Sequence, residues 1–571
     1  MSYIPWFERR PDLLEQEIRA FRENGLEFEL DDIAKEDLRT IIFRGVVIFL
    51  NEEEVEFELV YPSEFPAIRI IVKVNNISID RHQNPFEKNL CVIPHDQTGW
   101  ESWMTGAYMV NQAIRLLQDT NTGEEQVATN EVDSPEPWSN YIQFRWRPLL
   151  IPQHLPDNLK EIGTYTISGY IGHFYEYKDV KNPLIQHHYV LEVINQLGET
   201  IELEKPFSFQ ENQKNTTIEG VWFHLPKPPS FNLYDTKEVI DKLNEVMGEK
   251  MEIAELHSRI VRFRKMKPKE RKKYFPPNFS FIFDEENYER NQYRKAFIWG
   301  VYDFDNHCFH FSSPQYITKD EHFRRIPELT SLDNKKVLIT GLGSLGSAVA
   351  IELGKSGVGS FVLVDKDVLE VGNLVRHTGT MEYVGMSKTK LLEQQILSHY
   401  PFTNIELINQ IIGYEVEKMD ELFDKVNDVD MVINLTAEES VIKILNRLCL
   451  ESKTPVIHAW ISNGAWGGRV IRTLPYETGC YYCYLASENM DIASSPESEI
   501  YPRGCGFPTF SGASFDIYEV ATHTARMTIG TLLKKSIDYD HIVVNHYPQP
   551  NVEVYKIKRI SGCPLCGDNT L

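Results

Sequence analysis

Apolar and polar residues in the N-terminal part of the chain follow first a helical period and then a strand period. Residues 11–24 are mostly charged but carry leucine, isoleucine and phenylalanine on one side, which predicts an amphipathic helix. Runs of β-branched and aromatic residues then predict strands at residues 46–50, 55–61 and 68–74. Residues 107–118 return to the helical period and predict a second helix.

The middle of the chain is predicted to be mostly β. A polar stretch, residues 119–137, interrupts the pattern and is a candidate linker. Residues 140–235 are rich in Tyr, Ile, Thr and Val, with Pro and Gly between short runs, which predicts strands. Residues 236–256 predict a helix, and residues 296–311 predict further β structure. No motif in this part of the sequence indicates a chemistry.

From residue 336 onward, apolar strands alternate with helices, which predicts a doubly wound parallel sheet. The expected strands are residues 336–340, 360–365, 404–408, 431–435 and 456–459, and the expected helices are residues 345–356, 388–399 and 441–450. The whole chain is therefore expected to be a multidomain α/β protein. Its expected domains are residues 1–138, a β-rich middle domain of residues 139–318, and residues 319–571.

Length, charge and cysteine usage limit the possible functions. A chain of 571 residues is too long to fold around a single hydrophobic core. Its net charge of −24 argues against nonspecific nucleic-acid binding, which needs a basic surface. The first residues do not form a signal peptide, and no stretch of about 18 apolar residues predicts a membrane span. Four of the eight cysteines form two C-x-x-C pairs, which suits metal or redox chemistry in a reducing cytosol. The expected location is cytoplasmic.

A glycine-rich loop is the first candidate site. Gly341, Gly343 and Gly346 follow a predicted strand and open a predicted helix, where a backbone without side chains can approach phosphates. Asp365 ends the next predicted strand, where an acid can bind ribose hydroxyls. These residues alone fit NAD as well as ATP.

The residues that follow favour ATP. Asp367, Asn373, Arg376 and Lys388 lie within a short distance in sequence of the loop, and two cations exceed what a dinucleotide needs. They suit a triphosphate, whose charge must be neutralised while the α-phosphate is attacked.

Two further groups of cysteines indicate a metal and a thiol chemistry. A zinc site is expected at the two C-x-x-C pairs, with a redox dithiol as the alternative; the ligands would be Cys480, Cys483, Cys563 and Cys566. Cys505 stands between two glycines and near Arg503, which favours an accessible thiolate. A loop cysteine without a chemical role is the alternative there.

Residues 330–571 resemble the ThiF/MoeB/ubiquitin-activating-enzyme superfamily. The segments that carry the resemblance, after the glycine loop, are residues 365–368, 372–377 and 385–388, where Gly372 and His377 replace a serine and a glutamine. The resemblance implies that Asp365 and Asp367 handle ribose and Mg²⁺, and that Asn373, Arg376 and Lys388 handle the ATP phosphates. Ala437 stands where the family often has a magnesium-binding Asp, which makes Glu438 the candidate replacement. The resemblance also implies a homodimer in which Arg324 or Arg325 reaches the partner's ATP, and a thioester on Cys505.

Residues around Cys91 resemble ubiquitin-conjugating enzymes. Those enzymes have a Y-P-x-x-x-P turn, an H-P-N motif before the cysteine and a tryptophan after it; here the turn spans residues 61–66 and the tryptophan is Trp100. Gln83 replaces the proline of H-P-N, and the spacing to the cysteine is one residue shorter. The resemblance implies that Cys91 carries a thioester and that Asn84 stabilises the oxyanion.

Both resemblances together are those of bacterial E2–E1 fusions, most closely the CD-NTase-associated fusions of type II CBASS antiphage operons. They imply a ligase that adenylates the C-terminal carboxylate of a CD-NTase or ubiquitin-like partner, passes it from Cys505 to Cys91 and releases it to an amine. Two alternatives remain open: an adenylyltransferase for sulfur transfer to a carrier protein, and a non-catalytic adaptor.

Overall fold

The computed structural model contains two compact units, one of residues 1–205 and 210–316 and the other of residues 317–571 with 206–209. The structure describes residues 3–567 except for 50–51, 80, 94–98, 122–135, 143–148, 152–154, 156–161, 172–185, 195–199, 203–215, 230–232, 234–236, 242–257, 260, 263–264, 268–276, 288–291, 304–307, 488–491, 493, 495–498, 501–508 and 511. The division of the chain into three domains stays a prediction.

The N-terminal part of the first unit is a four-stranded antiparallel sheet in the order β1-β2-β3-β4 with helices beside it. The strands are β1 (Phe28–Leu30), β2 (Ile41–Ile48), β3 (Glu54–Tyr61) and β4 (Ile71–Val74), and the helices are α1 (Trp6–Arg9), α2 (Pro11–Glu23), α3 (Asp32–Asp37) and α4 (Gly106–Asn121). The three predicted strands and both predicted helices are confirmed, with shifted ends. β1 and α3 were not predicted because elements this short show no clear period.

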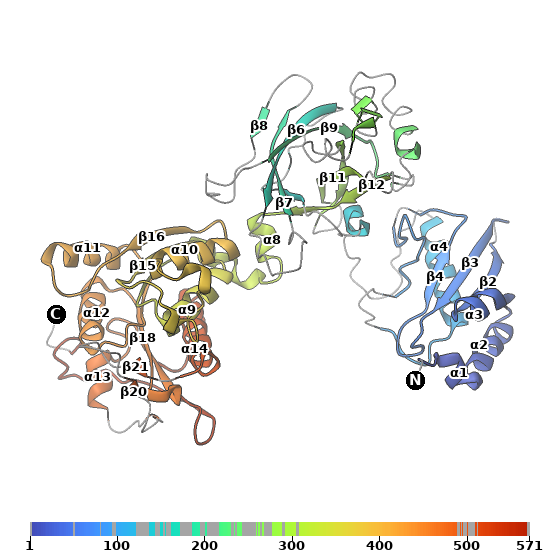
Figure 1. The fold of residues 1–571 in the computed structure, drawn as a ribbon. Coiled ribbons are helices and arrows are strands. Elements are labelled where there is room, and N and C mark those ends of the chain that lie inside the picture. Colours follow the sequence, from blue (N-terminus) through green and yellow to red (C-terminus); the bar gives the residue numbers. More distant parts are fainter. Residues whose placement is uncertain are drawn as a thin grey trace. The chain divides into compact units, whose positions relative to one another are not determined.

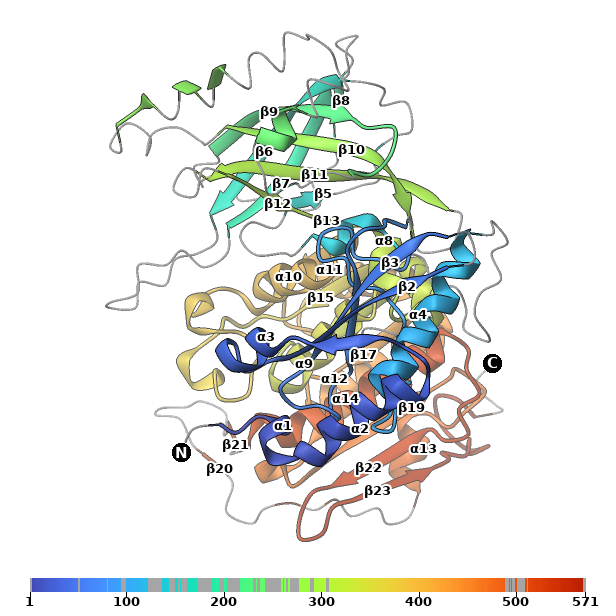
Figure 2. The ribbon, with the colours of Figure 1, turned by 90° about the vertical axis from the view of Figure 1, so that its right-hand side faces the viewer.

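A nine-stranded sheet forms the rest of the first unit, so the predicted β-rich middle is confirmed (Figure 2). Its strands are β5 (Leu149–Ile151), β6 (Ile162–Ile171), β7 (Gln186–Ile194), β8 (Thr200–Glu202), β9 (Thr216–His224), β10 (Asn278–Glu286), β11 (Tyr293–Asp303), β12 (Cys308–Ser312) and β13 (Pro314–Tyr316). A short helix, η1 (Trp138–Tyr141), precedes them. Most of the helix expected at residues 236–256 lies outside the described residues, although 237–241 are helical.

The second unit is built on an eight-stranded sheet in the order β16-β15-β14-β17-β18-β19-β22-β23. Its strands are β14 (Lys336–Thr340), β15 (Ser360–Val364), β16 (Asn404–Ile408), β17 (Met431–Asn434), β18 (Val456–Ile461), β19 (Gly467–Thr473), β22 (His541–Asn545) and β23 (Asn551–Tyr555). A separate short pair, β20 (Glu499–Ile500) and β21 (Thr509–Phe510), lies outside this sheet.

Helices cover both faces of this sheet, as a doubly wound fold requires (Figure 1). Ile339 of β14 packs in a core with α9 (Ser344–Lys355), α10 (Lys388–His399) and α14 (Ser514–Leu532). Its neighbour Leu338 points to the other core, with α11 (Val416–Asn427) and α12 (Glu439–Ser452). The smaller helices of this unit are α8 (Lys319–Phe323), η2 (Pro327–Asn334), η3 (Val371–Asn373), η4 (Met381–Tyr383), η5 (Asn463–Ala465) and α13 (Tyr481–Ala486).

The five predicted strands form the expected parallel sheet, and three antiparallel strands that were not predicted extend it. β16, β15, β14, β17 and β18 pair in parallel, but β19, β22 and β23 pair antiparallel. Only a short turn, η5, joins β18 to β19, and a parallel return would need a crossover of about a dozen residues or more. No described helix is both long and apolar enough to cross a membrane.

Candidate adenylation, zinc and thiol sites

The glycine loop lies at the point where the strand order of the sheet reverses. From β14 the chain moves to β15 and β16 on one side, and later to β17 and β18 on the other. Ligands of open α/β sheets bind at such a point, outside the carboxyl ends of the strands. Gly341 follows β14 directly, and a Cβ on Gly341 would lie 2.6 Å from the backbone nitrogen of Thr436, just after β17. The glycine loop therefore lies at the crevice where a ligand is expected to bind.

The three glycines of the loop differ in why they are needed. Gly341 has a φ of +81°, which side chains rarely adopt, and a Cβ on Gly346 would lie 1.9 Å from the carbonyl oxygen of Gly341. A Cβ on Gly343, by contrast, would meet nothing within 4 Å. Gly341 and Gly346 thus shape the turn, while Gly343 leaves open the space through which a phosphate can approach the first turn of α9.

Two side chains hold the backbone of Leu342 from opposite directions. Its amide donates to Asp365 Oδ2 at 2.6 Å, and its carbonyl oxygen lies 3.0 Å from His377 Nε2. Because His377 Nδ1 accepts from the Gly379 amide at 2.8 Å, the proton lies on Nε2, which donates to Leu342. Burial lowers the pKa of His377 to about 4, so this ring is a neutral donor at pH 7.

Both predicted cations are shielded from solvent: Arg376 is partly buried and Lys388 is largely buried. Lys388 begins α10 and is 8% exposed; its Nζ lies 2.9 Å from Asp367 Oδ2. Burial lowers the pKa of Arg376. The backbone amides of Arg376 and His377 both donate to the carbonyl oxygen of Asn373, at 3.0 and 2.8 Å. Asn373 accordingly organises the turn that carries the arginine.

After β17, Ala437 stands at the position where the resemblance implies a magnesium-binding Asp. Ala437 has a φ of +57°, and Asn434, 1% exposed, accepts hydrogen bonds there from Thr340 and from Thr436. The Glu438 carboxylate has no hydrogen-bond or ion-pair partner among the described residues. Asn434 was missed by the sequence analysis, because a buried amide at a strand end has no distinctive spacing.

The four C-x-x-C cysteines come together in one buried cluster. Their sulfur atoms all lie within 4.8 Å of one another, with 3.6 Å between Cys480 and Cys563 and 3.4 Å between Cys483 and Cys566. Zinc–sulfur bonds of about 2.3 Å in a tetrahedron would place sulfurs about 3.8 Å apart. The Ile560 amide donates to Cys483 Sγ at 3.4 Å, as a second hydrogen-bonding layer around a thiolate would. The donor set fits zinc, and it would tie the end of the chain to the sheet.

Cys91 is half-buried and follows a loop that the backbone amide of Cys91 and the side-chain amide of Gln83 hold in place. Its amide donates to the His82 carbonyl oxygen at 2.7 Å. Gln83, 4% exposed, donates to the carbonyl oxygens of Val74 and Ile77, so it holds the loop against β4. This contact replaces the rigidity that a proline gives in an H-P-N motif.

Asn84 has its side-chain oxygen fixed and its amide nitrogen unused. Oδ1 accepts from the amides of Phe86 and Glu87 at 2.9 and 3.0 Å, in a turn typical of Asn. Nδ2 has no hydrogen-bond partner among the described residues. A fixed amide with a free N–H donor is what stabilisation of an oxyanion requires.

The other predicted residues have different outcomes. Cys505 lies outside the described residues, so its role stays a prediction. Arg324 and Arg325 are both exposed at the end of α8. Arg324 lies 3.8 Å from Glu321, whereas Arg325 has no hydrogen-bond or ion-pair partner in the described part of the chain.

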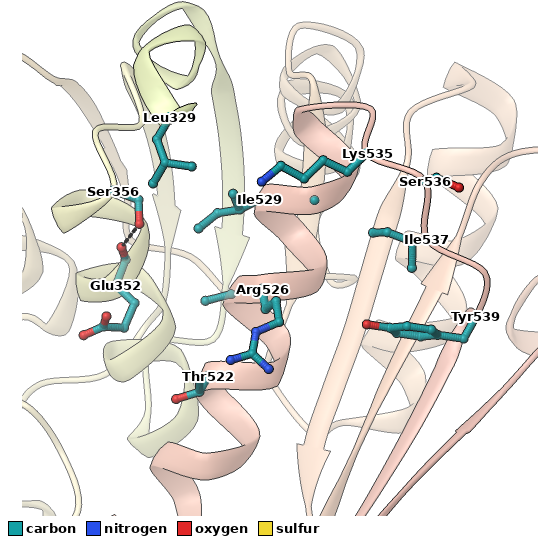
Figure 3. A pocket seen from close by; sticks show the side chains of 12 residues that line it. Leu329, Glu352, Ser356, Thr522, Arg526, Ile529, Lys535, Ser536, Ile537 and Tyr539 are labelled. Carbon is teal, nitrogen blue, oxygen red and sulfur yellow. Dashed lines mark hydrogen bonds between the residues drawn. The ribbon is translucent and has the colours of Figure 1, made fainter. Parts of the chain in front are cut away.

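A cavity of about 390 Å³ in the same unit is not the nucleotide site (Figure 3). Glu352 and Ser356 line it at the C-terminal end of α9, whereas the glycine loop precedes the N-terminal end, roughly 18 Å away at 1.5 Å per residue. Ile529, Arg526 and Lys535 contribute its other side.

The fold and the site of the second unit define a nucleotide-binding α/β domain with a phosphate loop at its switch point. Residues 320–538 match the model of the ThiF family, and this part of the chain is a ThiF-type adenylation domain. By their names, the relatives that match this part of the chain include an adenylyltransferase and a ubiquitin transferase-like protein.

Three relatives illustrate how far the similarity reaches. Uncharacterized protein y4oA of Sinorhizobium fredii (strain NBRC 101917 / NGR234) is 24% identical over 92% of this chain and 90% of its own. The sulfur carrier protein ThiS adenylyltransferase of Escherichia coli (strain K12) is 27% identical, over 41% of this chain and 86% of its own. ATP-dependent ubiquitin transferase-like protein Cap2 of Enterobacter hormaechei subsp. hoffmannii (strain UCI 50) is 29% identical, over 32% of this chain and 30% of its own.

Proposed function

We propose that this protein is a ubiquitin-like ligase that activates a carboxylate with ATP and transfers it through two thiols to an amine. In the first step an oxygen of the partner's C-terminal carboxylate attacks the α-phosphorus, and pyrophosphate leaves. Arg376 and Lys388 neutralise charge on the phosphates as it develops. Asp365, Asp367 and Glu438 are the candidate carboxylates for ribose and Mg²⁺, an ion that would neutralise the pyrophosphate.

Formation of a thioester, one thioester exchange and an aminolysis follow in this proposal. The Cys505 thiolate attacks the acyl carbon and AMP leaves; the Cys91 thiolate then attacks, and the Cys505 thiolate leaves. Finally an amine attacks, the C–N bond forms, the C–S bond breaks and the amine loses a proton. The free Nδ2 of Asn84 supports this step, because it can donate to the oxyanion formed next to Cys91.

The observation that carries the proposal is the open space at Gly343 together with Lys388, a buried cation that pairs with Asp367. The Asp367 amide donates to Asp365, whose carboxylate also accepts from the Leu342 amide in the glycine loop. The similarity to Cap2, by its name a ubiquitin transferase-like protein, favours conjugation as the outcome. From the resemblance of the sequence motifs to those of bacterial E2–E1 fusions, we further propose a CD-NTase or ubiquitin-like protein as partner, a role in antiphage defence, a bacterial cytoplasmic location and a homodimer. The unpaired side chain of Arg325 makes it the better candidate to reach the second copy's ATP.

Nucleotide binding tests the first step without knowledge of the partner. Lys388→Ala should weaken binding of a non-hydrolysable ATP analogue in calorimetry by roughly tenfold or more, the worth of a charge-assisted hydrogen bond. Lys390→Ala is the matched control, because Lys390 lies on the same helix, is exposed and has Glu393 as its one ion-pair partner in the described part of the chain. Equal affinities of the two variants, or tighter binding of NAD than of the analogue, would refute the ATP assignment.

Sulfur transfer is the second candidate, and the similarity to the ThiS adenylyltransferase over 86% of that protein favours it. In that reaction the adenylated carboxylate becomes a thiocarboxylate, and Cys91 has no role. Intact mass spectrometry of the protein with ATP and its partner distinguishes the two functions. A thioester on Cys91 supports ligation, whereas a thiocarboxylate on the partner with an unmodified Cys91 supports sulfur transfer.

A further inference from the structure

Two glutamates outside the four-stranded sheet hold the segment that leads to Cys91. Glu136 Oε2 accepts the His82 amide at 2.8 Å, and the His82 carbonyl in turn accepts the Cys91 amide at 2.7 Å. Glu286 Oε1 accepts from Arg81 Nη1 at 2.5 Å, and its Oε2 accepts from the backbone amide of Glu136 at 2.9 Å. We call these two residues the Glu136–Glu286 cluster.

The cluster is anchored in the nine-stranded sheet. Glu286 is the last residue of β10, and the preceding Glu285 is 2% exposed. Glu285 accepts from the amide and hydroxyl of Ser139 at 2.8 and 2.9 Å, and from Arg294 of β11 at 3.0 Å. Hydrogen bonds therefore connect the backbone of Cys91, through His82 and Glu136, to Glu286 at the end of β10, next to the buried Glu285.

The Glu136 carboxylate serves to orient its neighbours, because both of its oxygens already accept hydrogen bonds. Oε1 accepts from the Tyr141 hydroxyl, and Oε2 accepts from the His82 amide. His82 has a φ of +60°, a conformation that residues other than glycine seldom adopt without support. The hydrogen bond that the His82 amide donates to Glu136 supplies that support, and the carbonyl of the same residue accepts from the Cys91 amide.

We propose that Glu136 and Glu286 are positioning residues for acyl transfer at Cys91, and that the β-rich middle thereby controls the thiol site. This inference rests on the proposed function, in which Cys91 accepts an acyl group. The cluster fixes the backbone at His82 and Cys91. The Cys91 thiolate can then attack the acyl carbon while the Asn84 amide donates to the acyl oxygen. Small displacements of such groups slow reactions strongly, since a shift of about 1 Å can cost roughly a hundredfold in rate.

A chemical probe tests this without the natural partner. The full chain with Cys505→Ala is incubated with a glycylglycine thioester of mercaptoethanesulfonate, and intact mass follows acyl-Cys91 formation and its discharge to free lysine. Cys91→Ala measures the background. Glu136→Ala should slow acyl transfer to Cys91 by about tenfold, the worth of one charge-assisted hydrogen bond. The maximal rate should fall, with little change in the half-saturating probe concentration.

Glu136→Gln separates positioning from proton transfer. The glutamine oxygen can accept from the His82 amide, and its NH₂ can donate to the Tyr141 hydroxyl oxygen, so the rate should return to within about twofold of the parent. Its pH–rate profile should match the parent's. A general base would be lost in Glu136→Gln as fully as in Glu136→Ala, and that result would overturn the positioning role. Glu15→Ala, an exposed acid on α2 without a described partner, is the matched control.

Hydrogen exchange of the peptide spanning residues 81–93 gives a readout that does not need the thioester. Glu136→Ala and Arg81→Ala should both speed exchange in this peptide by roughly tenfold, and Glu136→Gln should not. Arg81→Ala keeps the Glu136 contacts to His82 and Tyr141 and changes no residue of the nine-stranded sheet, so it decides the matter if Glu136→Ala does not fold. Unchanged exchange and unchanged transfer in Arg81→Ala and Glu136→Ala would overturn the inference. If the two alanine variants exchange faster but the parent forms no acyl-Cys91, the structural link stands and the proposed function is refuted.

Discussion

His377 gives a prediction in which a single proton controls the shape of the nucleotide loop. Its neutral ring donates from Nε2 to the Leu342 carbonyl and accepts at Nδ1 from the Gly379 amide. Protonation adds a donor at Nδ1, which removes the second hydrogen bond and places a charge in a site that is 5% exposed. The folded pKa of about 4 lies below the ordinary value of 6.5.

The sign and size of the effect follow from that difference. Between the two values the unfolded chain binds more protons than the folded one, so stability rises with pH. The contribution of neutral His377 is complete above pH 6.5 and is lost as the pH falls towards 4. At 1.36 kcal/mol per unit, the shift corresponds to ~3 kcal/mol in the stability of this unit.

Calorimetry of the parent and of His377→Gln measures this contribution. Glutamine can make both hydrogen bonds but does not titrate, so the variant should lose less stability between pH 7 and pH 4.5. The relevant transition is the one that an ATP analogue moves to higher temperature. His458 and His541, whose pKa values burial lowers to about 3 and about 4, titrate in both chains and cancel from the comparison.

Two results bear on the reasoning. His377→Ala leaves the buried Leu342 carbonyl without its donor, so binding of the ATP analogue at pH 7 should weaken by roughly tenfold. If the parent and His377→Gln lose stability equally between pH 7 and pH 4.5, the neutral-ring assignment is refuted.

Three further predictions concern the metal, the dimer and the thiols. Elemental analysis should find one zinc per chain, and Cys563→Ser should lower the melting temperature of the adenylation domain without a direct effect on a chemical step; well under one equivalent would contradict the zinc site. Light scattering should give a dimer, and Arg325→Ala should weaken ATP-analogue binding more than Arg324→Ala; a monomer at micromolar concentration would contradict both expectations. Cys505→Ala should keep adenylation but lose both thioesters, and Cys91→Ala should keep the Cys505 thioester but lose the final conjugate; conjugation at the parental rate in Cys91→Ala would show that the N-terminal domain only binds.

Periodic segments were predictable because their burial leaves a regular trace in the sequence. The strands at 336–340 and 404–408 and the helix at 388–399 were located with their observed ends. The first strand is a short apolar run between Lys336 and Thr340, the second alternates apolar residues with Glu406, and the helix begins beside a Ser387 cap. The antiparallel return at β19 was missed, because the decisive feature is a short turn rather than a periodic one.

The sequence by itself determined which chemical groups the protein carries: a phosphate loop, four soft metal ligands, and a cysteine beside an Asn. Local spacing sufficed for these, since glycine turns and C-x-x-C pairs are built from neighbours in the chain. Only the tertiary structure decided which distant residues complete each site. Asn434 joins the nucleotide crevice from β17, and Glu136 and Glu286 reach the Cys91 segment from the β-rich part of the first unit. Such contacts depend on the packing of whole sheets, and a hydrogen bond between residues 205 positions apart leaves no pattern in either stretch of sequence.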